Sequence, residues 1–430
     1  MDSISRECVI DDVGMYRYRG AVRLSPLGMI DDLACVALCG FDSVQMNAVI
    51  NGKINAKRLE FNKDKCVKLH VSKEQNKNCC RTKLGSSEQF IVPCVQLEVQ
   101  GLEMKQSESE KYIGDFISSN GSMDLNIQNR KSQGIGELSQ IFSMLKEVSL
   151  GFSYVQIGLI LRESNLISKL LLSCESWHRV NKYHVEWLEE VDFSFFRQLF
   201  NAHSKTCKEI FLLESGKIPV RFLISMRRIM FWWHIMHVNK DDMLYRVYRA
   251  QKVSPVQGDW INLLNSDKSL FNVNMTDEDL ESISSDKLKN YLKKTAQNLT
   301  LNFIESLQQK HSKSEKYDTA ELKTAPYLID RRFSKYEREL LFKLRSRTLQ
   351  VKNNFQNGNL ENLFCDLCKL FTCSQEHVLS CPEITKKIRI VNTVKLEHSD
   401  IFGNVDQQLT YIKIYSQFWS ERQSLLESEQ

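Results

Sequence analysis

A short segment near the C-terminus combines four potential metal ligands and constrains the local fold more than any other feature. Cys365 and Cys368, with two residues between them, are followed by His377 and Cys381. Three thiolates and one imidazole at this spacing suit a closed tetrahedral Zn²⁺ site of the structural kind. We expect the first pair to lie on a turn, and His377 and Cys381 to share one face of a helix. The sequence therefore predicts a small zinc knuckle, with Cys373 as an alternative ligand and free or buried thiols as the competing interpretation.

The cysteine content indicates which cellular compartment to expect. The sequence has 13 Cys, an odd number, and its first residues show no basic and then apolar signal peptide. A secreted disulfide framework is therefore not expected. Since no stretch approaches the ~20 apolar residues that span a bilayer, we expect a soluble, intracellular protein without a membrane partner. The sequence does not distinguish nucleus from cytoplasm.

The net positive charge is small overall, but basic residues are concentrated in one segment. With 58 Lys+Arg against 53 Asp+Glu, the net charge of +5 permits a nucleic-acid partner without requiring one. One segment upstream of the predicted knuckle is strongly basic and also carries apolar residues at helical spacing. Its cations are Arg331, Arg332, Lys335, Arg338, Lys343, Arg345, Arg347 and Lys352. We expect a basic helix that contacts the nucleic-acid backbone, and an ordinary solvated helix face is an equally good interpretation.

Two adjacent carboxylates, Asp31 and Asp32, separate the apolar runs 27–30 and 33–39. Short apolar runs around a polar pair predict a β-hairpin whose turn carries both carboxylates. Such a pair can hold Mg²⁺, as two-metal phosphoryl transfer requires. Taken alone, an Asp-Asp dipeptide is more often a solvated turn.

The hairpin is followed by patterns of both secondary-structure types. A helix is expected from about Asp42 to Leu59, and the alternating stretch 66–71 predicts a strand. Hairpin, helix and strand in this order form half of a ferredoxin-like sandwich. Further short strands are expected at 95–104, turning at Gln100-Gly101, and a single one at 112–117.

Helical spacing dominates from about Asn126 onward. One long amphipathic segment is expected from Val220 to Tyr248, with His234 and His237 in the packed core rather than at a metal. Thr276, followed by three acidic residues, is typical of a helix start.

With these residues assembled, the chain resembles the reverse transcriptases of non-LTR (LINE-type) retrotransposons, from the late palm to the C-terminal knuckle. The run from Pro26 to Ala37 looks like the family's catalytic hairpin with its x-x-Asp-Asp loop. The residues that look like the following helix and strands are Asn47, Ile50-Asn51, Lys57, Leu59, Phe61-Asn62, Lys65-Cys66 and Tyr112-Ile-Gly114. The stretch Leu213-Glu214-x-Gly216-x-Ile-Pro219-x-Arg221 resembles the helical thumb and linker region.

The resemblance implies RNA-directed DNA synthesis from deoxynucleoside triphosphates, with RNA and DNA as partners. It assigns Mg²⁺ to Asp31 and Asp32, and the protonation of the pyrophosphate leaving group to Lys65, with Lys63 as the alternative. It assigns Zn²⁺ and nucleic-acid contact to the C-terminal knuckle and the basic helix.

The sequence also departs from the family's pattern. A complete enzyme has an earlier palm strand with a third carboxylate and a nucleotide-binding segment, whereas 30 residues precede Asp31 and Met1 looks like an internal start. We therefore expect a truncated remnant that does not polymerise alone. The alternatives are a nucleic-acid-binding protein acting through the basic helix and knuckle, and a translated remnant without function.

The expected fold class is α+β. A partial ferredoxin-like palm (β-hairpin, helix, strand) precedes a mostly α-helical thumb and linker region and a small zinc knuckle. The expected segments are 1–120 (partial palm), 121–255 (helical thumb-like region), 256–320 (helical linker), 321–385 (basic helix and knuckle) and 386–430 (C-terminal helices).

Overall fold

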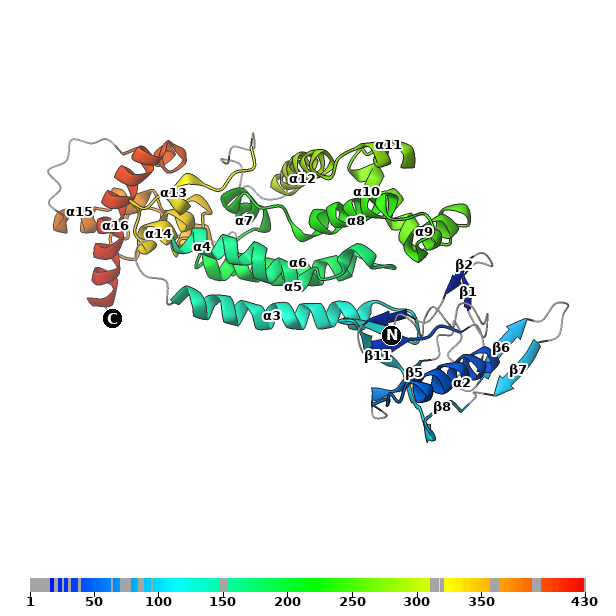
Figure 1. The fold of residues 1–430 in the computed structure, drawn as a ribbon. Coiled ribbons are helices and arrows are strands. Elements are labelled where there is room, and N and C mark those ends of the chain that lie inside the picture. The colour runs from blue at the N-terminus through cyan, green and yellow to red at the C-terminus, as the bar shows by residue number, and fades with distance from the viewer. Residues whose placement is uncertain are drawn as a thin grey trace. The chain divides into compact units, whose positions relative to one another are not determined.

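The computed structural model describes most of the chain and divides it into two compact units. The described residues are 16–18, 22–24, 27–29, 32–37, 40–62, 65–69, 79–83, 89–93, 96–146, 153–309, 317, 321–355, 363–388 and 396–428. The first unit comprises Met1–Asn129, Ser173–His184 and Ser225–Lys289, and the second comprises Arg130–Leu172, Val185–Ile224 and Asn290–Gln430. Small sheets and predominant helices confirm a mixed fold, compatible with the expected α+β class (Figure 1). The five predicted segment boundaries stay predictions.

The described strands all lie in the first unit and pair two by two. Five pairs are antiparallel: β1 (Tyr16–Tyr18) with β2 (Val22–Leu24), β3 (Leu27–Met29) with β4 (Asp32–Ala34), β6 (Cys79–Lys83) with β7 (Gln89–Pro93), β8 (Glu98–Val99) with β9 (Leu102–Glu103), and β11 (Ser109–Tyr112) with β12 (Asp115–Ser118). The sixth pair, β5 (Val67–Leu69) with β10 (Lys105–Ser107), is parallel.

The predicted hairpin and the helix after it are confirmed, but Asp32, which was predicted in the turn, is the first residue of β4. Met29 lies opposite Asp32 in the β3–β4 register, while Asp31 lies outside the described residues. Helix α2 (Gly40–Ala56) buries Met46, Ile50 and Ile54, and Leu33 of β4 packs against them. Among the described strands, β5 is hydrogen-bonded to β10 rather than to the hairpin. The ferredoxin-like arrangement of these elements therefore stays a prediction.

The single strand predicted at 112–117 is instead a hairpin, β11–β12. Its turn falls at Ile113 and Gly114, whose φ angles are 48° and 89°. A glycine adopts such angles without steric cost, so the chain reverses at the point where a continuous strand was expected. The turn predicted at Gln100-Gly101 is confirmed between β8 and β9.

The helical part of the first unit contains α9 (Met243–Val253), α10 (Trp260–Leu270) and α11 (Asp277–Ser282), together with most of α8 (Val220–His237). The long segment predicted to Tyr248 ends at His237, because Asp242 starts α9 by accepting a hydrogen bond from the Leu244 backbone N–H. His234 and His237 are exposed, which corrects the expectation that they lie in the core. The capping box of α11, Thr276 with Asp279, is confirmed.

In the second unit, the regular elements of the described residues are helices, apart from one isolated bridge. Helix α3 (Asp124–Lys146) enters it from the first unit, as Figure 1 shows by its continuous ribbon. The others are α4 (Tyr154–Leu161), α5 (Ile167–Leu170), α6 (Lys182–Leu199), α7 (Lys208–Ser215), α12 (Ser285–Gln308), α13 (Pro326–Ile329), α14 (Lys335–Arg345), α15 (Pro382–Lys387) and α16 (Val405–Ser428). The core at α6, α7 and α14 is aromatic, and the Phe200 and Phe342 ring centroids lie 4.9 Å apart.

Candidate metal centre and basic helix

The structure brings together the four predicted zinc ligands. One ligand atom from each of Cys365, Cys368, His377 and Cys381 lies within 4.8 Å of the others. The Sγ atoms of Cys365 and Cys381 are 3.9 Å apart, and Cys368 Sγ lies 3.3 Å from His377 Nε2. Tetrahedral zinc with Zn–S bonds of about 2.3 Å places two sulfurs about 3.8 Å apart. The group could therefore hold a metal ion such as zinc.

Local backbone structure explains why these side chains converge. An antiparallel bridge between Phe364 and Thr372 closes the loop that carries the first two cysteines. Inside the loop, the backbone N–H of Lys369 donates to the Cys365 carbonyl at 2.9 Å, and Lys369 has a φ of 56°. This tight turn directs Cys365 and Cys368 to one side.

The second ligand pair departs from the predicted helix. His377 begins a short 3₁₀ helix (His377–Leu379), and Cys381 is the N-cap residue of α15. The expectation that the two share one helical face is therefore wrong. Pro382 fixes the first turn of α15 and ends the preceding structure at Cys381, so the ligands come from two short elements.

The surroundings of the cluster alter the acidity of its ligands. Burial raises the pKa of Cys368, but N–H groups of Leu370 and Phe371 directed at the sulfur outweigh it, so the pKa is lower than usual. Burial raises the pKa of Cys365 to about 12. Burial and the nearby Arg422 lower the pKa of His377, which favours the neutral imidazole that binds metals. A bound cation favours the thiolate form of every cysteine ligand.

Cys373, the alternative ligand, is engaged elsewhere. Its sulfur lies 3.6 Å from Nη2 of Arg422 on α16 and is not part of the ligand group. The residue is buried, and its carbonyl accepts a hydrogen bond from the Asn353 backbone N–H. Cys373 therefore packs the metal loop against α16.

A buried glutamine fixes the metal loop to the helices behind it. Gln375 is fully buried, and its amide nitrogen donates to the Leu344 carbonyl at the end of α14. Tyr415 of α16 donates to the Gln375 carbonyl at 2.8 Å. Sequence reasoning missed Gln375 and Arg422, because neither residue type nor spacing marks a docking contact.

The outer surface of the loop is apolar. Phe364, Leu370 and Phe371 are 48 %, 66 % and 55 % exposed. Phe371 also lies beside the metal cluster, with its ring centroid 5.5 Å from that of His377. Lys369, in the same loop, is exposed. We call Phe364, Lys369, Leu370 and Phe371 the loop surface.

The predicted basic helix corresponds to α14, but its arginines do not form one open face. Arg345 pairs with buried Glu214 of α7 at 2.7 Å, which corrects its assignment as a nucleic-acid contact. Arg338 is buried and donates to the Asp330 carbonyl. Arg338 and Arg345 point inward because residues three and four apart share one side of a helix. Both lie on the same side as the buried Leu341.

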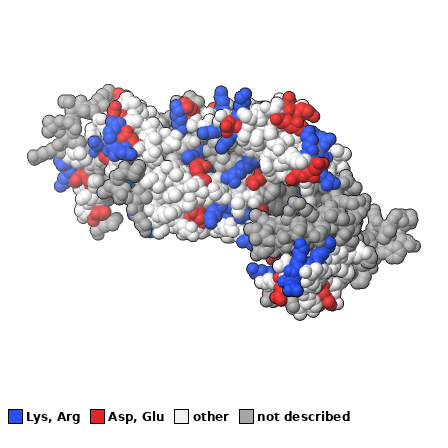
Figure 2. Space-filling view, viewed as in Figure 1, with Lys and Arg blue, Asp and Glu red and all other residues white. Residues whose placement is uncertain are grey.

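The other predicted cations are nearer the surface, and several have acidic partners. Arg332 pairs with Asp330 and Asp406, and Lys335 with Glu339 at 4.0 Å. Arg347 pairs with Glu376 and Lys352 with Asp366, while Arg331 is exposed and Lys343 half-buried. On the face that Figure 2 shows, the described cations alternate with acidic residues.

The predicted Mg²⁺ site stays a prediction. Asp32 is the first residue of β4 and Lys65 is exposed before β5, while Asp31 lies outside the described residues. Within the part of the chain that the structure describes, the Cys₃His cluster is the one group found that could hold a metal.

The stretch 213–221, singled out in the sequence, has a structural explanation. Glu214 accepts hydrogen bonds from Arg345 and Tyr317. Gly216 has a φ of 65°, and a Cβ there would collide with the backbone of Lys323. Arg221 pairs with Glu189 at 2.6 Å. Glu214, Gly216 and Arg221 therefore each contact another segment of the second unit.

The site defines the class of protein only as one with a Cys₃His group that could hold a metal ion, docked on a helical unit. No protein-family model, curated protein or solved structure matches the chain. No helix among the described residues is long and apolar enough to cross a membrane.

Proposed function

We propose that the chain is a zinc-dependent nucleic-acid-binding protein and that the metal centre presents the loop surface to unpaired bases. The observation that carries this proposal is the exposure of Phe364, Leu370 and Phe371 around a partly buried ligand cluster. Large apolar side chains on an outward-facing loop are unfavourable in water unless a partner covers them. Aromatic rings beside a lysine suit bases and phosphates together.

The metal would act as a structural element. All four ligands come from the protein, so a zinc ion bound by them has no open position for a substrate. The cluster would instead hold the turn at Lys369 and keep Phe371 directed outward.

The test is a comparison of matched variants in binding a fluorescent single-stranded oligonucleotide. Stacking of one base on an aromatic ring is worth about 1–3 kcal/mol, so Phe371→Ala is expected to raise Kd roughly tenfold. Ile160→Ala is the control, since Ile160 of α4 is similarly exposed in the same unit but distant in sequence from the metal loop. Anisotropy titrations measure both. Equal affinities of Phe371→Ala and the unmodified chain would show that the loop surface is not the binding site.

A second proposal concerns ancestry: the chain is a remnant of a non-LTR retrotransposon reverse transcriptase. The supporting observation is the succession of the β3–β4 hairpin, with Asp32 as the first residue of β4, and the helix α2 that packs against it. In this proposal the hairpin and helix belong to a partial ferredoxin-like palm. Asp31 and Asp32 would hold Mg²⁺, and Lys65 would act as the general acid.

We expect no primer extension from a chain of these 430 residues. Two-metal polymerisation needs a third carboxylate and a nucleotide pocket, to which the resemblance assigns no residue of this sequence. The measurement is Mg²⁺- or Mn²⁺-dependent extension of a primer on an RNA template. Extension that disappears in Asp31→Ala would overturn the expectation and establish an active polymerase.

A further inference from the structure

A large cleft opens in the second unit between four helices. Its volume is about 1150 Å³, and its walls are the C-terminal ends of α3 and α6, the start of α4, and residues 331–338 at the start of α14. Pockets for small ligands measure about 300–1,000 Å³. The cleft is thus large enough for part of an extended polymer.

The lining of this cleft is strongly cationic. Among the described residues that line it, the cations are Lys146, Arg197, Arg331, Arg332, Lys335 and Arg338, and the one acidic residue is Glu337. Glu337 accepts a hydrogen bond from the Ser334 backbone N–H in the capping box of α14, and Arg332 is already paired with two aspartates. The free carbonyls at the ends of α3 and α6 contribute about half a negative charge each. Lys335 is also paired with Glu339 beside the cleft, so cations exceed acidic groups among the described lining residues by less than their number suggests.

Two arginines of the cleft have donors that the protein does not satisfy. Nε of Arg197 and Nε of Arg338 are buried and have no hydrogen-bond partner among the described residues. Burial also lowers the pKa of Arg338, against the effect of Asp330 and Glu337. Because both Nε atoms have almost no solvent-accessible surface, they lower stability but are not contacts for a ligand in the open cleft.

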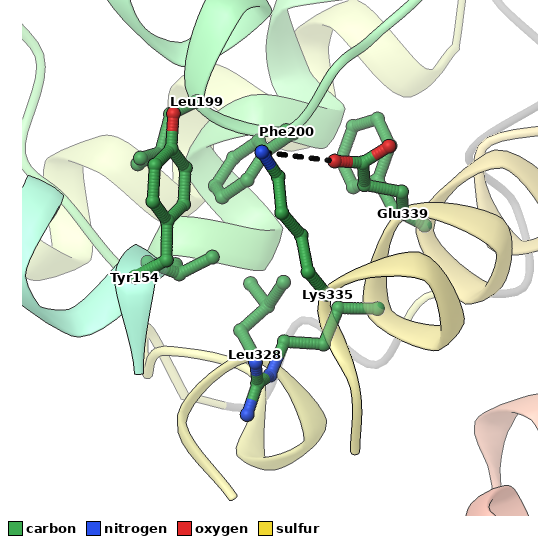
Figure 3. A pocket seen from close by; sticks show the side chains of 9 residues that line it. Tyr154, Leu199, Phe200, Leu328, Lys335 and Glu339 are labelled. Carbon is green, nitrogen blue, oxygen red and sulfur yellow. Dashed lines mark ion pairs between the residues drawn. The ribbon is translucent and has the colours of Figure 1, made fainter. Parts of the chain in front are cut away.

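A small recess beside the cleft holds one of the cations in place. The ammonium of Lys335 lies between the ring of Tyr154, 4.6 Å from its centroid, and the carboxylate of Glu339 (Figure 3). Leu199, Phe200 and Leu328 form the apolar walls of this recess. Lys335 is therefore oriented at the margin of the cleft before a ligand arrives.

We infer that the cleft binds the phosphate backbone of a single-stranded nucleic acid. The inference rests on the nucleic-acid binding proposed above and assigns the phosphates a site separate from the loop surface. Guanidinium groups bind phosphate through paired N–H donors, and a nucleic acid supplies phosphates at regular intervals along an extended chain. Lys146 and Arg197, which lie outside the predicted basic helix, are the new contacts.

The test compares two double variants that remove the same charge from the full chain. Lys146→Gln with Arg197→Gln alters the cleft. Lys131→Gln with Lys169→Gln is the control, since Lys131 of α3 pairs with Glu190 and Lys169 of α5 with Glu137. Binding of a fluorescent oligouridylate is measured by anisotropy over a range of salt concentrations. Each lost phosphate contact lowers the slope of log K against log salt by about 0.7 for single strands, so the cleft variant is expected to lose about 1.4.

The outcomes are separable from those of the proposed function. A reduced slope and affinity in the cleft variant, with the control unchanged, support the inference. If the unmodified chain binds and both variants match it, the cleft assignment is overturned while binding through the loop surface stands. Absence of any binding overturns both, and competition by polyglutamate equal to that by oligouridylate overturns nucleic acid as the occupant. If the double variant does not fold, the single variant Lys146→Gln tests the cleft assignment in the same way, because the Lys146 side chain is exposed.

Discussion

Cys381→Ser is expected to abolish zinc binding and to unfold residues 363–388, while most of the helical structure remains. Cys381 is fully buried, and the apolar residues of this module that are also buried are few: Cys365, Cys373, Val378 and Ile384. Zinc binding to small Cys/His modules is worth about 10–16 kcal/mol at neutral pH, which is comparable to the whole stability of a domain. So small a core does not replace that contribution.

Zinc content and protease sensitivity measure this effect. The unmodified chain is expected to contain one zinc per molecule and to resist cleavage within 363–388, whereas Cys381→Ser contains none and is cut there. Cys373→Ser is the matched control, because Cys373 is also buried within residues 363–388 but contacts Arg422 instead of the ligand group. Stoichiometric zinc in Cys381→Ser, or its loss in Cys373→Ser, would contradict the assignment of ligands.

The metal centre could be predicted because its chemistry is local. Four ligands within seventeen residues can meet through turns alone, so residue type and spacing suffice. The start of α11 was predictable for the same reason, since Thr276 and Asp279 satisfy each other within one turn. The hairpin β3–β4 likewise followed from two adjacent apolar runs and a polar pair between them.

The directions of the basic residues could not be predicted from composition. Arg345 was expected on a nucleic-acid surface, but its partner Glu214 lies 131 residues earlier in the chain. A charge count along α14 does not show which cations face an acid brought close by folding. His234 and His237 were misplaced for a related reason: Trp232, Ile235 and Met236 take the buried side of α8 and leave the histidines in solvent.

The cleft also depends on tertiary structure. Lys146 and Arg197 stand at the ends of two helices, and nothing in their sequence surroundings distinguishes them from other helix-terminal cations. The six cations line one cleft only because the fold places the ends of α3 and α6 near the start of α14. For this chain, prediction from sequence therefore succeeds where the interacting residues are close in sequence. It fails where the fold brings together residues that are distant in sequence.

The contact between Glu214 and Arg345 leads to the second large effect. Arg345→Met is expected to destabilise the second unit by about 3–5 kcal/mol, because it leaves the fully buried Glu214 carboxylate without its counter-charge. Tyr317 would still donate to Glu214, but a single neutral hydrogen bond contributes only about 1 kcal/mol. Burial would lower the pKa of Arg345, but Glu214 more than offsets this and raises it, so Arg345 is charged in the folded protein.

Thermal unfolding followed by circular dichroism measures this destabilisation. For a unit of this size, about 1 kcal/mol shifts Tm by roughly 2–4 °C, so a decrease of about 10 °C is expected. Arg332→Met is the matched control, because Arg332 pairs with Asp330 and Asp406 at the surface, where such pairs are worth about 0–1 kcal/mol. The double variant Glu214→Leu with Arg345→Met removes both charges and should regain part of the lost stability. Equal Tm values for Arg345→Met and Arg332→Met would mean that Arg345 is not buried against Glu214, and its predicted role at a nucleic-acid surface would then be open again.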